Sequence, residues 1–443
     1  MCNETTASTK NLNLENVYLK LSDFLKEPDN HEGFFKEEDG LLTVNEIEFD
    51  TETYTDIKDT KLSFISRKES ETSLDVEVYL RNNFQSVKFN NCKFNYDLLI
   101  NHNLDALTIS KCIFEKKCYI NNQYKNNNNE IKIDDILIEE TKFKSNFKLH
   151  RVIIENFKIY DTDFLKNADF FKSHFKNTNT KKITFNAINF HELALFGEAI
   201  FDRFLQFKYV TFKGYAHFRS TTFTEGLDLE YSNIEQEMNF FNIQKLDTSI
   251  SKQNTSQETY RIIKYQLQKV GSIIDSNKYH ALELEKKKVT LSENPSKNLL
   301  EFLIFQIHFL SSKHSTDWFI TLLWMINITF LYSQYKILLN QGLSESFIIP
   351  FILNILFVIS FFPSSESDKL YKIYRILISI PIYLMYSLGT KDYYLKCFSN
   401  NINPFSIMTG EETLTLSTLI YKMIIAYLIY QFIISIRQNT RRS

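Results

Sequence analysis

The sequence contains few glycines and prolines, and this scarcity excludes several classes of protein. It holds nine Gly and six Pro among 443 residues, and no two glycines lie closer together than Gly33 and Gly40. A Walker loop needs glycines five apart, a dinucleotide-binding fingerprint two and three apart, and a hydrolase nucleophile elbow four apart. All three motifs are therefore excluded. Prolines are absent between Pro28 and Pro295, so no proline interrupts a long stretch of backbone.

Neither the charge nor the cysteines point to a nucleic-acid partner or a disulfide framework. The 51 Lys and Arg nearly balance the 53 Asp and Glu, so nucleic acid is not expected as a partner. The five cysteines are scattered at Cys2, Cys92, Cys112, Cys118 and Cys397, which suits a reducing compartment and indicates no metal site. The first residues include no apolar run, so no cleavable signal peptide is expected.

Four apolar segments follow residue 316, whereas the average hydropathy of the chain is mild. A helix needs about 20 mostly apolar residues to cross a bilayer. The segments therefore predict transmembrane helices at about residues 317–337, 346–363, 371–389 and 414–436. Asn327 and Asn354 lie within these segments and are expected to form hydrogen bonds between helices. Buried helices of a soluble core are the alternative interpretation.

Basic residues around these segments predict their orientation. Lys369, Lys372 and Arg375 lie between the second and third segments, and Arg437, Arg441 and Arg442 follow the fourth. The positive-inside rule then places both termini in the cytosol. The preceding apolar segment Leu299–Leu310 is too short to span, and we expect an interfacial helix there. His308 within it is expected to be a polar interruption rather than a ligand.

The middle of the chain repeats aromatic and aliphatic residues every five or six positions. From Phe185 to Phe240 the steps alternate between five and six without an error, and looser steps of five begin at Phe84. Neither a helix, with a period of 3.6, nor a strand, with a period of two, explains this spacing. It indicates a chain that turns a corner between inward residues, so that stacked coils align Phe on Phe. The predicted core ladder is Phe84, Phe89, Phe94, Phe114, Phe185, Phe190, Phe196, Phe201, Phe207, Phe212, Phe218, Phe223 and Phe240.

This pattern resembles the pentapeptide-repeat family, in particular its Phe-rich branch and bacterial members anchored by C-terminal transmembrane helices. The resemblance implies a β-solenoid, a right-handed quadrilateral β-helix, whose central Phe or Leu and the residue two before it face inward. Cys92 and Cys112, each two before a Phe, are then buried, whereas Cys118 lies between repeats at a position expected to be exposed. The β-helix is predicted over residues 79–245, after an N-terminal segment, residues 1–78, with early strands.

Residues 246–297 are predicted to form a helical hairpin. Thr255-x-x-Glu258 reads as a capping box that opens its first helix, and Gly271 suits the C-terminal end of that helix. Ser272-x-x-Asp275 is expected to start the second. The hairpin either caps the open edge of the last coil, as solenoids require, or couples the coil to the membrane. The interfacial helix and the four transmembrane helices then occupy residues 298–443.

The sequence contains no recognisable catalytic, cofactor-binding or metal-binding motif, so no enzymatic activity and no cofactor are expected. Arg375 and Lys422 lie in or near predicted spans, where a charge suggests function, although both lie close enough to a span end to reach water. The loop between the last two spans ends in Glu411 and Glu412 and resembles the pore loop of a two-helix channel module. These four residues are the candidates for a pore or gate.

Two functions are consistent with these features. The first is a non-enzymatic protein of a bacterial cytoplasmic (inner) membrane, whose cytosolic coil binds an unidentified protein partner or self-associates, with the lipid bilayer as its anchor. The alternative is an oligomeric ion channel or transport component whose path is formed by the last two helices and the 391–412 loop, although the Gly-Tyr-Gly ladder of potassium filters is absent. Mimicry of DNA ranks last, because it requires a strongly acidic rod.

Overall fold

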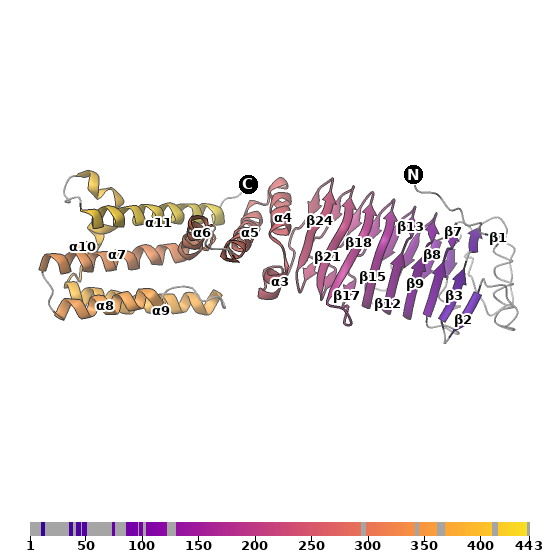
Figure 1. Ribbon diagram of the computed structural model, residues 1–443, viewed down its shortest axis with the longest axis horizontal. Helices are drawn as coiled ribbons and strands as arrows, with labels where there is room; N and C mark the ends of the chain where they lie inside the picture. Colours follow the sequence, from indigo (N-terminus) through magenta and orange to yellow (C-terminus); the bar gives the residue numbers. More distant parts are fainter. Residues whose placement is uncertain are drawn as a thin grey trace. The chain divides into compact units, whose positions relative to one another are not determined.

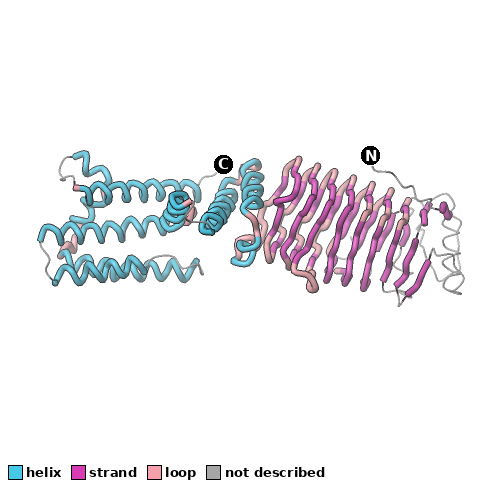
Figure 2. Tube along the Cα trace, in the orientation of Figure 1, coloured by secondary structure: helices cyan, strands magenta, loops and turns pink. Residues whose placement is uncertain are grey.

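The computed structural model describes residues 10–13, 35–38, 41–45, 47–50, 73–75, 86–95, 97–100, 103–121, 130–293, 298–341, 345–360, 368–409 and 415–440. By its internal contacts the chain divides into two compact units, Met1–Val270 and Gly271–Ser443. The first unit is built mainly of strands and the second of helices (Figure 2).

The first unit is a β-solenoid of about six turns, in which short strands stack in parallel from turn to turn (Figure 1). Its larger sheet contains β1 (Lys10–Asn13), β2 (Phe35–Glu38), β3 (Leu41–Asn45), β4 (Ile47–Asp50), β6 (Ser86–Asn90), β7 (Lys93–Phe94), β9 (Leu104–Ser110), β10 (Ile113–Phe114), β12 (Ile131–Glu139), β13 (Lys142–Phe143), β15 (Val152–Phe164), β17 (His174–Phe175), β18 (Lys182–Phe190), β20 (Ile200–Phe201), β21 (Phe204–Phe212), β23 (Thr222–Phe223) and β24 (Leu227–Ile234). Its smaller sheet contains β5 (Ser73–Asp75), β8 (Asp97–Ile100), β11 (Cys118–Ile120), β14 (Phe147–Leu149), β16 (Ala168–Asp169), β19 (Ala194–Leu195), β22 (Ala216–His217) and β25 (Met238–Asn239).

The register between turns explains the spacing of the Phe residues. Phe185 in β18 pairs with Phe207 in β21, so this turn takes 22 residues, which equals two steps of five and two of six. Strands upstream of residue 79 already belong to the same sheet, because β3 pairs with β6 and β4 pairs with β7, all in parallel. The stacked turns therefore begin before the Phe-rich region.

A Phe-rich stack fills the interior, as the sequence pattern predicts. One column holds Phe94, Phe114, Phe143, Phe164, Phe190 and Phe212, whose neighbouring ring centroids lie 4.4–5.2 Å apart with planes within 14° of parallel. A second column continues from Phe170 through Phe196 and Phe218 to Phe240. All predicted ladder residues within the described part of the chain are buried, and Phe84 lies outside that part.

The cysteines of the coil are buried, including one that the spacing places outside the core. Cys92 and Cys112 are 2% and 1% exposed, which confirms the expectation for them. Cys118, expected to be exposed, is instead fully buried, because Cys118 and Ile120 both face inward from β11 and flank Tyr119. Burial raises the pKa of the Cys118 and Cys112 thiols, so both stay protonated and unreactive at neutral pH.

Several corners of the coil adopt a left-handed conformation without glycine. Successive turns place a residue with a φ of 47–56° at one corner, and the side chains there are Lys111, Glu140, Asp161, Ala187 and Tyr209. A glycine is required elsewhere, at Gly214, because a Cβ atom there would lie 2.0 Å from the backbone oxygen of Glu192 in the preceding turn. Gly214 thus serves a close approach between turns, whereas residues with a side chain form these corners.

Two helices close the last turn of the coil, namely α3 (Ser249–Asn254) and α4 (Gln257–Lys269). The Oγ1 atoms of Thr255 and Thr259 accept hydrogen bonds from the backbone N–H groups of Leu227 and Leu229, at 3.2 and 2.9 Å. The side-chain oxygen of Gln266 accepts another from Met238. These side chains satisfy edge donors that would otherwise lack a strand partner. This end of the coil is therefore capped.

The helix boundaries differ from the expected ones by small shifts. The N-cap of α4 is Ser256, whose Oγ accepts from the backbone N–H of Thr259, so the expected Thr255 capping box is wrong by one residue. Thr255 instead ends α3 and bonds to the coil edge. Gly271, with a φ of 79°, follows the C-cap of α4, as expected. The next helix, α5 (Ile273–Glu293), begins after Ser272.

The helical unit continues with α6 (Leu299–Ser312), α7 (Trp318–Gln341), α8 (Glu345–Ser360), α9 (Asp368–Thr390), α10 (Lys396–Ile402), the 3₁₀ helix η2 (Pro404–Thr409) and α11 (Leu416–Thr440). The central helix is α7, which packs against α8, α9, α10 and α11. Hydrogen bonds from Asn327 and Gln334 of α7 reach Ser379 and Met385 of α9, so these two helices run in the same direction.

Two described helices are long and apolar enough to cross a membrane. They are α11, with a mean hydropathy of 1.9, and residues Ile373–Thr390 of α9, with a mean hydropathy of 1.3. These correspond to the fourth and third expected spans. The described apolar part of α8, Ile348–Ile359, is shorter, and α7 is not among the two, because Asn327, Ser333 and Gln334 lower its hydropathy. Four transmembrane helices are thus not shown.

The stacked rings predict a large and local cost for truncating one of them. Phe196 is fully buried between Phe170 and Phe218, at centroid distances of 4.8 and 4.9 Å. Phe196→Ala should lower the free energy of unfolding by about 3–5 kcal/mol, and Phe196→Leu by less, because the cavity is smaller. Urea unfolding of the full chain in detergent, followed by the far-ultraviolet β-signal, measures both. Tyr209→Ala, at a corner side chain that is 63% exposed, is the control, and an equal loss in it would contradict the stack as the source of stability.

Candidate functional site

The interior of the helical unit contains a buried lysine that holds the segment between α9 and α11. Lys422 of α11 is 4% exposed. Its Nζ atom donates to the backbone oxygens of Asn401 and Asn403, at 2.9 and 2.6 Å, and to Oγ of Ser406 at 2.7 Å. The carbonyl groups at the end of α10 lack helical partners and carry partial negative charge, so a cation there is stabilising. Lys422 thus fixes residues 401–406 against α11.

Tyrosines and hydroxyl side chains join α7 to α11 beside this lysine. Tyr421 donates to Oγ1 of Thr329, and Tyr332 donates to Oγ1 of Thr418, both at 2.9 Å. The two tyrosine rings stack at a centroid distance of 3.7 Å. Asn401 adds a 2.8 Å hydrogen bond to Ser333 of α7. Polar side chains therefore join these helices beside the apolar side chains that they bury.

Amide side chains join α7 to its other neighbours. Nδ2 of Asn354 in α8 donates to Oε1 of Gln334 at 2.7 Å, and Nε2 of Gln334 donates to the backbone oxygen of Met385 in α9 at 2.8 Å. Nδ2 of Asn327 donates to Oγ of Ser379 at 3.3 Å. The expected interhelical bonds of Asn327 and Asn354 are confirmed. Gln334, which sequence reasoning missed, connects all three helices, and its position within an apolar run is the signal that marks it.

Two of the four candidates for a pore or gate, Arg375 and Lys422, lie within the described residues, on different helices. Arg375 of α9 is 1% exposed and lies one turn before Ser379, on the helix that packs against α7 and α8. Lys422 instead lies on α11 and is directed toward residues 401–406. Glu411 and Glu412 lie outside the described residues. Both described cations are buried, Arg375 on α9 and Lys422 on α11.

A pair of histidines lies where α6 meets the start of α7. The Nδ1 atoms of His308 and His314 are 3.2 Å apart, and Nε2 of His308 lies 3.0 Å from Oγ of Ser315. Burial lowers the pKa of both rings. For His314, burial together with the nearby His308, Lys288 and His280 lowers the pKa to about 3. Both rings are therefore neutral at physiological pH. No group of three or more metal-ligating side chains occurs in the described part of the chain.

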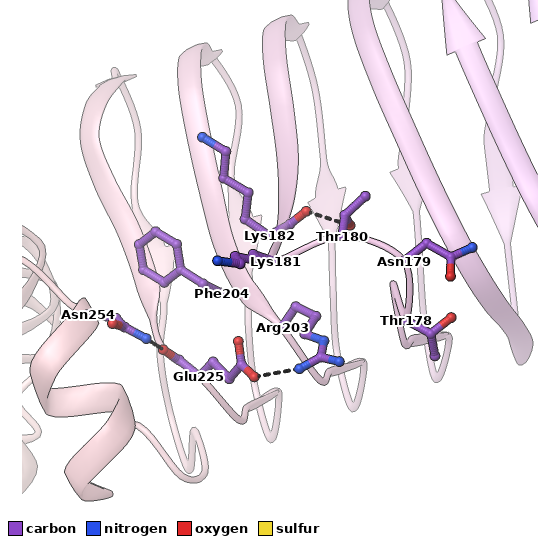
Figure 3. Close-up of a pocket in the computed structure, with 9 residues that line it drawn as sticks. All are labelled: Thr178, Asn179, Thr180, Lys181, Lys182, Arg203, Phe204, Glu225 and Asn254. Atoms are coloured by element: carbon purple, nitrogen blue, oxygen red, sulfur yellow. Dashed lines mark hydrogen bonds and ion pairs between the residues drawn. The ribbon is translucent and has the colours of Figure 1, made fainter.

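The coil carries a hollow of about 560 Å³ beside the corner between β17 and β18 (Figure 3). Its wall is formed by the corner residues 178–181, and Lys182, Arg203, Phe204, Glu225 and Asn254 complete the lining. Arg203 and Glu225 form an ion pair at 2.9 Å, and Asn254 of α3 donates to the backbone oxygen of Glu225 at 2.8 Å. Sequence reasoning missed this hollow, because it depends on residues brought together by stacking.

Comparison of the chain with protein-family models, with curated proteins and with solved structures finds no match. The pentapeptide-repeat resemblance is consequently not confirmed by these comparisons.

The contacts of Lys422 predict that its loss loosens the segment that follows α9. Lys422→Met removes three charge-assisted hydrogen bonds, each of about 1.5–3 kcal/mol, and leaves the buried backbone oxygen of Asn401 without this donor. The partly exposed Cys397 in α10 reports the opening. In a Cys2→Ser background, a maleimide should modify Cys397 about tenfold faster in this variant than in the parent.

Lys391→Met is the matched control, because Lys391 is an exposed lysine near the same segment. An unchanged Cys397 rate in Lys422→Met would show that Lys422 does not hold the segment. A rate raised equally in both variants would attribute the effect to lost surface charge.

Proposed function

We propose that this chain is a non-enzymatic, membrane-anchored scaffold of the pentapeptide-repeat kind. Its coil binds a protein partner or a second copy of the chain, and its helical unit lies in a bacterial cytoplasmic membrane with both termini in the cytosol. The observation that supports this proposal most is the inverted polarity of the helical unit, whose buried side chains include many polar groups while its outward side chains are apolar.

The outward faces of the helices are rich in large aliphatic side chains. Those at least half exposed include Ile349 and Leu356 on α8, Leu377 and Ile380 on α9, and Met423 on α11. Only 28% and 33% of the two apolar segments in α9 and α11 is buried. A soluble protein rarely exposes so continuous an apolar surface, whereas lipid would cover it. The short helix α6 exposes Leu300 at 77% and Ile304 at 66%, as an interfacial helix would.

The inward polar groups favour four spans, although among the described residues α9 and α11 alone are long and apolar enough to cross a membrane. Since α7 is central, its Asn327, Ser333 and Gln334 bond to neighbouring helices and need not face lipid. Because α7 and α9 run in the same direction, an antiparallel α8 between them would give spans that alternate in direction. Lys369 and Lys372 in the first turns of α9, and Arg437 in the last turn of α11, favour a cytosolic location for those helix ends.

The coil suits binding rather than catalysis. Its interior is filled by rings, and many of its outward charges pair between turns, as Lys144 does with Glu115 and Lys176 with Glu155. Such a rod offers long faces of regularly spaced side chains, which protein partners or a second copy can read. Tyr209 and Tyr231, 63% and 54% exposed and 6.3 Å apart, form an aromatic pair of the type enriched at interfaces.

The alternative is an oligomeric ion path formed by α11, α9 and the intervening loop. The buried Arg375 and Lys422 favour it as intramembrane charges. It ranks second because three oxygens of residues 401–406 already hold Lys422, which gives that cation a structural role. Ion flux through vesicles containing the purified chain, altered by Glu411→Gln, would favour the alternative over the scaffold.

The membrane anchor is tested by an outward-facing charge. Wild-type chain should remain in the membrane pellet after alkaline carbonate extraction. Ile380→Lys, at a side chain that is 52% exposed on α9, should reduce the membrane-inserted fraction, because a lysine at a span centre costs about 2.5–3.5 kcal/mol. Tyr209→Lys on the coil is the control and should have no effect. Release of the wild-type chain by carbonate would contradict an integral membrane protein.

The scaffold role is tested by photo-cross-linking in intact cells. A photoreactive amino acid at position 209 or 231 should give discrete adducts, of twice the mass of the chain for self-association or of another mass for a different partner. Position 158, an exposed lysine of the coil away from the tyrosine pair, serves as the comparison. If several exposed coil positions yield no adduct, the scaffold proposal fails.

A further inference from the structure

The hollow beside the corner between β17 and β18 exists because one turn of the coil is longer than its neighbours. Ile159 pairs with Phe185, 26 residues on, whereas Phe185 pairs with Phe207, 22 residues on. The additional residues fall at 177–181, between β17 and β18, where the chain swings outward (Figure 3). The rings on either side stay in their columns, so the insertion changes only the surface.

The buried side chain of Asn177 holds this outward corner in place. Asn177 is 1% exposed, with a φ of 47°. Its Oδ1 accepts from the backbone N–H of Phe157 at 3.1 Å, and its Nδ2 donates to the backbone oxygen of Phe157 at 3.1 Å. A second bond from Nδ2, to Oγ1 of Thr180, is also 3.1 Å long. One buried amide thus replaces the strand pairing that the insertion interrupts and fixes the wall of the hollow.

The lining of the hollow carries an excess of positive charge. Lys181, Lys182 and Arg203 line the hollow together with one acid, Glu225, which is already paired with Arg203. Nζ of Lys182 donates to the neutral Oε1 of Gln206 at 3.1 Å. Within the described part of the chain, Lys181 has no ion-pair or hydrogen-bond partner. Two lysines therefore present charge that the coil does not neutralise.

The other lining groups match an extended peptide. Thr178 and Asn179 supply hydroxyl and amide groups that can bond to a peptide backbone, and Phe204 supplies an apolar contact. The side chains of Thr180 and Asn254 are held by hydrogen bonds within the coil. A volume of about 560 Å³ falls within the usual range of binding pockets, about 300–1,000 Å³. Lysine and arginine beside neutral hydrogen-bonding groups favour carboxylate-bearing segments, since charge-assisted bonds are the stronger ones.

We propose that this hollow binds an acidic segment of a protein partner, with Lys181 and Lys182 as the residues that select its carboxylates. The inference rests on the proposed scaffold function and names the surface and the partner chemistry. Arg203 holds Glu225 in the lining of the hollow through their ion pair. The negative charge of Glu225 limits the affinity of the hollow for the acidic segment.

The test uses the full chain in nanodiscs of phosphatidylcholine and a fluorescein-labelled hexaglutamate peptide, followed by fluorescence anisotropy. Wild type should bind this peptide and not its hexaglutamine counterpart, and binding should weaken when the salt rises from about 50 to about 300 mM. Lys181→Glu and Lys182→Glu should each weaken binding about tenfold. Glu225→Gln should tighten it, because the acid that competes for Arg203 is removed.

Lys213→Glu is the matched control, a charge reversal at an exposed coil lysine outside the hollow, and it should bind as wild type does. Unchanged thermal midpoints establish that each variant is folded. Equal binding by wild type, Lys181→Glu and Lys213→Glu would overturn the proposal. So would tighter binding of a hexauridine RNA than of the peptide, or hexaglutamine binding as tightly as hexaglutamate.

Failure of this inference is distinguishable from failure of the proposed function. If cross-linking finds a coil partner while Lys181→Glu binds the peptide as tightly as wild type, only the assignment of the hollow is wrong. If no coil position cross-links in cells, the scaffold function itself falls, whatever the peptide does.

Discussion

The structure of the coil depends on one constraint, namely that aromatic rings must stack at the spacing set by backbone hydrogen bonds. Paired strands lie about 4.8 Å apart, and Phe94, Phe114 and Phe143 stack at 4.4 and 4.8 Å. Offset and stacked rings at such distances attract each other beyond the burial of their area. Each turn must therefore return a ring to the same column, which fixes the length of the path around the coil.

The same constraint decides where the coil can vary. An insertion that displaced a ring would leave a cavity in a close-packed interior, at a cost of several kcal/mol. The turn that contains Asn177 accommodates its additional residues at the corner, and Phe185 still lies 5.1 Å from Phe207. Surface hollows and recognition features thus arise at corners, because the interior cannot supply them. Closure by α3 and α4 follows from the same logic at the end of the stack, where edge donors would otherwise have no partner.

The sequence predicts the spacing of the inward residues better than it predicts which side chains face inward. The regular steps of five or six residues between Phe side chains predict stacked coils and a buried Phe ladder, because each turn repeats the same inward positions. This spacing does not tell which of two adjacent residues faces inward on a three-residue strand, so it predicts an exposed Cys118, whereas Cys118 is buried. Similarly, Thr255 and Ser256 can each cap a helix, and the tertiary bond from Leu227 to Thr255 decides between them. The hydrogen bonds of Lys422 and the hollow depend on residues distant in sequence, which no local pattern identifies.

The scarcity of glycine, which excludes glycine-rich motifs, also has a structural consequence at the corners of the coil. A left-handed conformation costs a residue with a Cβ atom about 1–2 kcal/mol, and the coil accepts this cost at Lys111, Glu140, Ala187 and Tyr209. The ladder bonds and stacked rings on both sides of each corner hold it in place. A glycine would relieve the strain but would present no side chain. Corners that carry lysine, glutamate or tyrosine give the rod a surface on which each turn displays a different group. Under the proposed scaffold function, that variation is what a partner would distinguish.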